Sequence, residues 1–172
     1  GTTSVTWTFL LVGLDILHVP MEVSVKILGG LCVGAILCLL AIEYYRQDAP
    51  ISIVLLAFSL LVFDRNFSLS MMVGLETGLY SLLLLAFCIV SRWYSDKGGR
   101  FPSVVMGGIG GLLFLTRPES LAILALTGCG IVYFRQTPNT KYSLIPILIW
   151  IVGVSAATLW RWSEFGDFIP NS

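Results

Sequence analysis

The chain has 172 residues, of which 56% are hydrophobic and 12% charged, and its mean hydropathy is +0.90. A soluble domain of this size does not need so much apolar surface, so the composition indicates a membrane protein. Ten basic and ten acidic residues cancel, which leaves no basic face for nucleic acid and no acidic tail.

The N-terminal segment, residues 3–17, is apolar but is interrupted by Asp15, and the next apolar run follows within a few residues. We expect residues 1–18 to form an interfacial or re-entrant helix on the outer face, with Trp7 at headgroup depth. A seventh span is the alternative. Because the chain starts at Gly1 and stops directly after a polar cluster, we expect a fragment of a longer chain.

Six further stretches of 15 to 19 residues carry no charged side chain. Such long apolar runs favour helices, since a barrel strand would alternate at every second residue. Fifteen residues cover roughly 22 Å of a hydrocarbon core near 30 Å, so each helix must extend past its flanking charges. The predicted spans are about 22–45, 49–63, 74–92, 101–116, 119–134 and 142–161. The expected fold is an all-α, polytopic transmembrane helix bundle, with residues 1–172 forming part of a single domain.

The basic residues set the orientation. If the loops at 46–49, 92–100 and 135–141 face the cytoplasm, they hold six of the ten lysines and arginines. With that topology, three polar clusters reach the opposite, outer surface, and Ser4 joins them. These clusters are Gly74-Leu75-Glu76-Thr77, Arg117-Pro118-Glu119-Ser120 and the segment 164–171 with Asp167 and Asn171.

Converging ionisable groups at membrane depth cost a few kcal/mol each unless they pair or line a wet cavity, so the clusters predict a polar pocket. Simpler explanations stay open. Arg117 and Glu119 can flank a tight turn at Pro118, each charge reaching toward water. Glu76 can sit in the first turn of its helix, where a carboxylate gains roughly 0.3–1 kcal/mol from the helix dipole.

Small and soft residues lie inside the apolar runs. Gly107-Gly108-Ile109-Gly110-Gly111 has no preceding strand, so we interpret the glycines at 107 and 111 as sites of close helix packing rather than as a nucleotide-binding loop. The cysteines lack partners at metal-ligand spacing, and we interpret all four as buried thiols. They are Cys32, Cys38, Cys88 and Cys129.

Four motifs in sequence order resemble the signatures of polytopic bacterial glycosyltransferases of the GT-C superfamily, and are similar to those of its arabinofuranosyltransferase-like and mannosyltransferase-like members. The motifs are Gly1-Thr2-Thr3-Ser4 with Trp7, Gly74-Leu75-Glu76-Thr77, Leu115-Thr116-Arg117-Pro118-Glu119, and Phe165-Gly166-Asp167 with Pro170-Asn171-Ser172. The chain departs from the usual pattern at Val5, Thr6, Ser120 and Ser172. The order and spacing otherwise agree along nearly the whole chain.

The resemblance implies inverting transfer of a sugar from a polyprenyl-phosphate donor to a glycan, lipid or protein acceptor. It implies a bacterial inner membrane location with an extracytoplasmic active face, and a catalytic Asp in an outer loop upstream of Gly1, so this fragment alone is expected to be inactive. In that frame Arg117, with Arg161 as a second candidate, binds the donor phosphate. The residues assigned to sugar or acceptor are Glu76, Glu119, Asp167, Asn171 and Ser4.

The resemblance implies no cofactor, and it leaves the need for a divalent metal open. The expected partners are the lipid-linked donor, the acceptor and the bilayer, with no nucleic acid. Two other functions compete with this interpretation. In a solute transporter segment, the glycine-rich helices and the break at Pro118 would surround a solute near the midplane. A non-catalytic membrane assembly subunit would have Glu76, Arg117 and Asp167 pointing to different surfaces.

Overall fold

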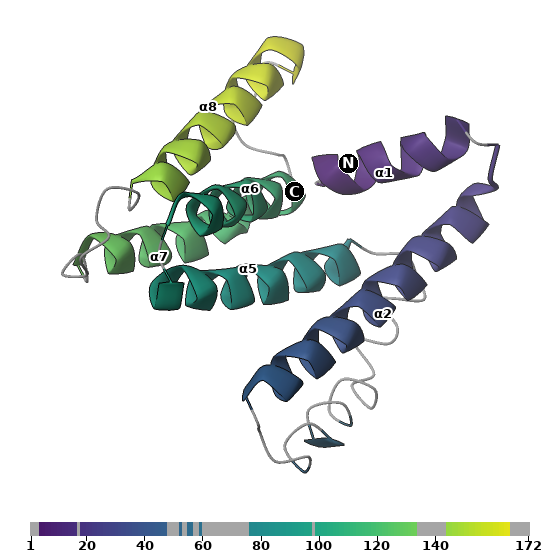
Figure 1. Cartoon of the computed structure of the whole chain (residues 1–172). Helices are drawn as coiled ribbons and strands as arrows, with labels where there is room; N and C mark the ends of the chain where they lie inside the picture. The colour runs from purple at the N-terminus through teal and green to yellow at the C-terminus, as the bar shows by residue number, and fades with distance from the viewer. Residues whose placement is uncertain are drawn as a thin grey trace. The chain divides into compact units, whose positions relative to one another are not determined.

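The computed structural model shows a helical protein (Figure 1). It describes residues 4–16, 18–47, 52, 55–56, 59, 76–97, 99–133 and 144–165. Its elements in this part of the chain are α1 (Val5–Ile16), α2 (Met21–Gln47), α5 (Thr77–Lys97), α6 (Arg100–Thr116), the 3-10 helix η1 (Pro118–Ser120), α7 (Leu121–Tyr133) and α8 (Ile145–Phe165). No strand occurs among these residues, which confirms the all-α fold class.

The helices fall on the apolar runs. Helix α2 covers the expected range 22–45, α5 begins three residues after the start of 74–92, and α8 covers most of 142–161. The expected span 49–63 lies largely outside the described residues. The N-terminal segment is helical, as expected, over Val5–Ile16.

Two helices, α2 and α5, are long and apolar enough to cross a membrane, judged by length and composition. Only 17% of the most apolar window of α2 and 11% of that of α5 is buried, whereas the core helix of a soluble protein would be mostly buried. The other apolar helices, α1, α6, α7 and α8, are shorter in their apolar part. Length and composition therefore favour membrane association, while the six-span bundle stays a prediction.

The chain divides into two compact units, one formed by residues 7–86 and the other by residues 1–6 together with 87–172. In the first unit, Trp7 of α1, Cys32 of α2 and Leu79 of α5 form a buried cluster. The surrounding side chains are Leu11, Leu28, Leu82 and Leu83. Helix α1 is thus packed through Trp7, and its aromatic ring is an anchor within this unit.

The turn from α1 to α2 closes with a Schellman-type cap. The backbone N–H of Val19 donates to the carbonyl of Leu14 at 3.3 Å, and that of His18 donates to Asp15 at 2.8 Å. His18 takes the left-handed conformation that such a cap requires, with φ 57°. Pro20 then sets the start of α2, and the Ser24 hydroxyl donates to the Val19 carbonyl at 3.4 Å. These bonds satisfy backbone groups that would otherwise be costly in apolar surroundings.

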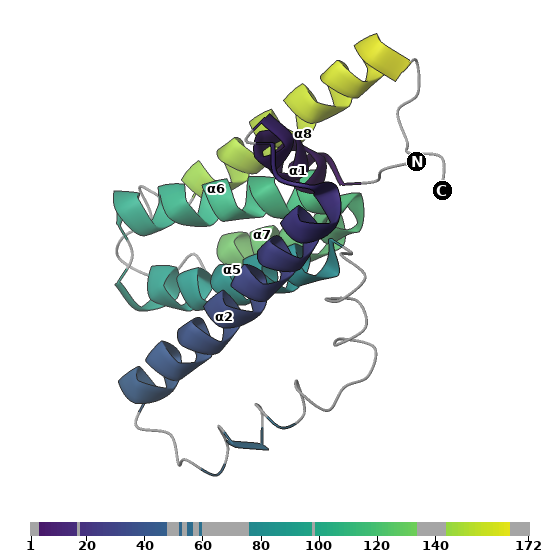
Figure 2. The same ribbon diagram turned by 90° about the vertical axis from the view of Figure 1, so that its right-hand side faces the viewer.

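In the second unit, α8 crosses α6 at close range (Figure 2). The buried residues of α6 recur every three to four positions, which is the spacing expected for a helix that packs on one side. They are Pro102, Ser103, Met106, Gly107, Gly110, Leu113 and Thr116. A Cβ atom at Gly107 would lie 2.6 Å from Cδ1 of Ile149, and one at Gly110 would lie 2.8 Å from Cδ1 of Trp150.

Trp150 fills the space that Gly110 leaves. Its side chain is buried, its indole N–H donates to the Met106 carbonyl at 3.4 Å, and its ring centroid lies 5.9 Å from that of Phe87. A buried indole N–H needs such a partner, and Met106 supplies it from the neighbouring helix.

Two expectations are corrected here. Close packing was predicted at Gly107 and Gly111, but the second contact is at Gly110, and nothing lies within 4 Å of a Cβ built at Gly111. Residues three and four positions after Gly107 both lie on the same face of α6. Which of the two makes the close contact depends on where the side chains of α8 lie. The four cysteines were expected to be buried, but Cys38, Cys88 and Cys129 are exposed and only Cys32 is buried. Helices that bury one face leave the others open to their surroundings.

We predict that Gly110→Ala destabilises the protein by about 1–3 kcal/mol, because the added methyl group overlaps the indole of Trp150. Gly108→Ala is the matched control, since nothing lies within 4 Å of its Cβ and alanine favours the helix by up to about 1 kcal/mol. Equilibrium unfolding in mixed micelles, followed by circular dichroism, measures both. Equal stability of the two variants would contradict the close approach of α6 and α8.

Candidate functional site

The polar break between α6 and α7 is the best-defined part of the predicted site. Helix α6 ends at Thr116, Arg117 is extended with φ −144° and ψ 116°, and Pro118–Ser120 form one 3-10 turn before α7 begins. Proline disfavours the helical conformation of the residue before it, so Pro118 explains why the helix ends at this point.

Local hydrogen bonds hold this turn. The backbone N–H of Arg117 donates to Leu113 at 2.8 Å, and that of Ser120 donates to Arg117 at 3.0 Å. The Thr116 hydroxyl donates to Leu112 at 2.8 Å. The turn is therefore built from its own chain, and its conformation does not depend on a ligand.

The side chains of the turn differ in exposure. Thr116 and Ser120 are fully buried, Arg117 is half-buried and Glu119 is exposed. The Ser120 hydroxyl oxygen has no hydrogen-bond partner among the described residues. The turn therefore carries a half-buried arginine and an exposed glutamate two residues apart in the sequence, between two apolar helices.

The helix dipoles account for the signs of these charges. Arg117 lies at the C-terminal end of α6 and Glu119 at the N-terminal approach to α7, where a cation and an anion are each favoured by about 0.3–1 kcal/mol. A guanidinium at such a place can also hold phosphate oxygens through two parallel hydrogen bonds.

The other predicted site residues are placed less completely. Glu76 is half-buried directly before α5, and its carbonyl accepts from the Tyr80 N–H at 2.9 Å. It precedes the first turn of the helix, which carries no acidic side chain. It belongs to the unit of residues 7–86, so its distance from Arg117 stays a prediction. Ser4 is buried directly before α1. Arg161 lies on α8, its side chain outside the description, and Asp167 and Asn171 lie outside the described residues.

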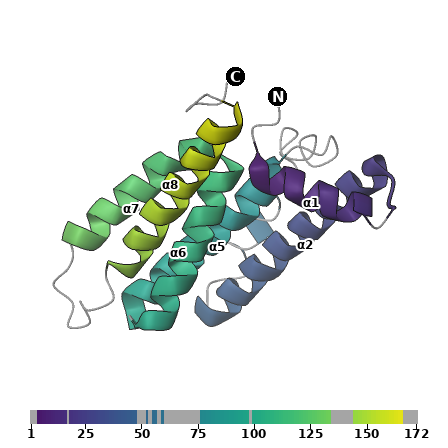
Figure 3. The same cartoon turned by 90° about the horizontal axis from the view of Figure 1, so that it is seen from above.

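An apolar groove along α7 and α8 was not foreseen from the sequence. It has a volume of about 940 Å³ and runs from Leu121, the first residue of α7, to Tyr133, the last. The two helices, which belong to the same unit, can be followed in Figure 3. The signal in the sequence was Gly128, which lies opposite Trp150, but a glycine in an apolar run does not show which helix it faces.

No group of three or more histidine, cysteine, aspartate or glutamate side chains gathers as metal ligands in the described part of the chain. Comparisons of the chain with family models, with curated proteins and with solved structures find no match. The resemblance to glycosyltransferases therefore rests on the sequence motifs alone.

Two fully buried serines provide a test of the turn. We predict that Ser120→Ala leaves stability unchanged or raises it by up to about 1 kcal/mol, because the hydroxyl has no partner in the described structure. Ser103→Ala is the matched comparison, since the Ser103 hydroxyl donates to the Gly99 carbonyl at 2.6 Å, and we expect a loss of about 1 kcal/mol. Unfolding in mixed micelles compares the two. An equal loss in both variants would show that the Ser120 hydroxyl is paired.

Proposed function

We propose that this chain is part of a membrane glycosyltransferase that transfers a sugar from a polyprenyl-phosphate donor, with inversion, at the extracytoplasmic face of a bacterial inner membrane. One observation carries the proposal. The Arg117–Pro118–Glu119 turn, part of the third motif, sets a half-buried guanidinium between two apolar helices, and an apolar groove begins four residues later. A cation beside an apolar groove suits a lipid that carries phosphate.

In the proposed reaction, an acceptor hydroxyl oxygen attacks the anomeric carbon, and the bond from that carbon to the phosphate oxygen breaks. The hydroxyl proton goes to a carboxylate base, which the resemblance locates upstream of Gly1. The lipid phosphate leaves with the electron pair. Its growing negative charge is stabilised by Arg117, and the gain is larger in a site of low dielectric constant than in water.

The remaining polar residues are assigned to orientation and binding. Glu119 orients Arg117 or binds sugar hydroxyls, and Glu76 and Asp167 hold sugar or acceptor. Ser4 and Asn171 are further acceptor or sugar ligands, and Arg161 is the second candidate for the phosphate. A transporter would instead need polar groups near the midplane, and no charged residue occurs within 121–133 or 145–160.

We predict that Arg117→Ala lowers turnover about a hundred- to a thousandfold in the longer enzyme that the resemblance implies. Loss of a donor to a developing oxyanion costs roughly 2.7–4 kcal/mol in other enzymes. Arg117→Lys should recover only part of the rate, because an ammonium group cannot reproduce the planar fork. The measurement is sugar transfer from a synthetic polyprenyl-phosphate donor at matched amounts of folded protein.

Arg92→Ala is the control. Arg92 is an exposed arginine on α5, and its Nε lies 3.9 Å from the Asp96 carboxylate. It belongs to the segment 92–100 that was predicted to be a cytoplasmic loop, although α5 continues as a helix to Lys97. Its loss should leave turnover unchanged. Equal turnover of the wild type and both Arg117 variants would remove Arg117 from the site and leave the turn with its structural role alone.

A further inference from the structure

The turn that joins α5 to α6 gathers basic side chains. Residues 92–100 hold the basic residues Arg92, Lys97 and Arg100 and one acidic residue, Asp96, so three positive charges and one negative charge leave a net charge of +2. The Nε atom of Arg92 lies 3.9 Å from the Asp96 carboxylate, and these two charges offset each other. Lys97 and Arg100 are exposed and form no ion pair with any residue that the structure describes. The net charge is therefore carried by these two side chains.

The turn is braced on both sides. Two residues separate α5 from α6, and the second, Gly99, has φ 101°, in the left-handed region that favours glycine. The Gly99 carbonyl accepts a hydrogen bond from the Ser103 hydroxyl at 2.6 Å. Across the turn, the ring centroids of Trp93 on α5 and Phe101 on α6 lie 5.7 Å apart in an edge-to-face arrangement. The chain itself thus holds the two cations near each other, without help from a ligand.

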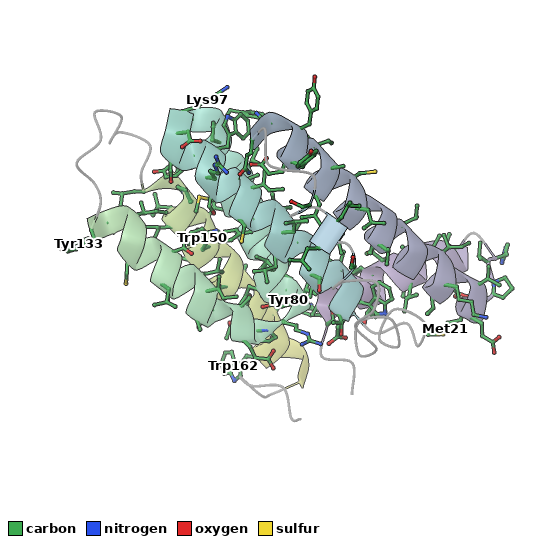
Figure 4. All side chains as sticks on the ribbon, turned by 90° about the horizontal axis from the view of Figure 1, so that it is seen from below. Met21, Tyr80, Lys97, Tyr133, Trp150 and Trp162 are labelled. Carbon is green, nitrogen blue, oxygen red and sulfur yellow. The ribbon has the colours of Figure 1, made fainter. Side chains whose placement is uncertain are left out.

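The turn lies between two apolar runs. No charged residue occurs in 77–91 before it or in 101–116 after it. Helix α5 is long and apolar enough to cross a membrane, and only 11% of its most apolar window is buried. Figure 4 labels Lys97 at one end of this helix and Tyr80 near the other. The two cations therefore lie where an apolar helix with an open surface ends.

An exposed aromatic ring accompanies the cations. Phe101 directly follows Arg100, and 68% of its surface is exposed. A turn surrounded by water has no need of an exposed phenylalanine. Aromatic and basic side chains together are typical of the level at which lipid headgroups meet the hydrocarbon core.

We propose that a basic tip, made of Lys97, Arg100 and Phe101, binds the headgroups of anionic bilayer lipids. The guanidinium of Arg100 can hold phosphate oxygens through two parallel hydrogen bonds, and the Lys97 ammonium adds a second positive charge. The Phe101 ring lies against the first part of the acyl chains. The inference rests on membrane association and is independent of the proposed sugar transfer.

The test compares two lipids that share their acyl chains. Native mass spectrometry of the protein in detergent micelles gives dissociation constants for dioleoyl phosphatidylglycerol, which is anionic, and dioleoyl phosphatidylcholine, which has no net charge. The wild type should prefer phosphatidylglycerol. Because each basic residue near an anionic membrane surface strengthens binding about fivefold, Lys97→Gln should lower this preference about fivefold and Lys97→Gln with Arg100→Gln about 25-fold.

Lys26→Gln is the matched control. It removes the same charge from an exposed lysine on α2, in the other compact unit, and should leave the preference unchanged. An unchanged affinity for phosphatidylcholine shows that each variant is folded. No preference in the wild type, an unchanged preference in the double variant, or a comparable loss in Lys26→Gln would each overturn the proposal. Binding of hexaglutamate by a wild type without a lipid preference would assign the tip to an acidic protein partner instead.

Discussion

The contact of Trp150 with Gly110 is the constraint on which the arrangement of α6, α7 and α8 depends. The indole can lie against α6 only because residue 110 has no side chain, and its N–H then bonds to the carbonyl of Met106. In apolar surroundings no hydrophobic force drives helices together, so close backbone approach and buried hydrogen bonds carry the association. The same indole also lines the apolar groove beside α7, where it lies opposite Gly128.

The polar turn and the groove differ in the same way as the two parts of an amphiphile. The turn carries charged side chains, and the groove is apolar. Pro118 ends α6 and places Arg117 and Glu119 at a break whose backbone groups are satisfied by local bonds. The helix dipoles alone explain why these two charges are tolerated there. They do not explain the groove that follows directly, since a structural turn has no need of an open apolar surface beside it. The conjunction of the turn and the groove is what supports the proposed phosphate-headed lipid.

Much of the fold was predictable, because in a chain this apolar the charged residues divide the sequence into runs of helix length. The helical class followed from those runs, and the approximate bounds of α2 and α6 followed from extending the runs past their flanking charges to the length of a membrane span. The packing glycine at 110, rather than 111, did not, because the choice between residues three and four apart depends on the partner helix. The break at Arg117 was predicted from Pro118, but the groove was not, since it depends on two helices whose facing sides the sequence leaves undefined. Asp167 and Asn171 stay predictions, as does the convergence of Glu76 with Arg117.

Whether the Arg117 turn meets a lipid phosphate is tested by photo-cross-linking with a polyprenyl phosphate that carries a diazirine in its first isoprene unit. The probe is bound in bilayers to the proposed glycosyltransferase, irradiated, and the labelled peptides are identified by mass spectrometry. Labelling is expected within residues 117–133, competed by unlabelled polyprenyl phosphate and reduced by Arg117→Ala. Labelling confined to other segments, or labelling of 117–133 that polyprenyl phosphate does not compete, would contradict it.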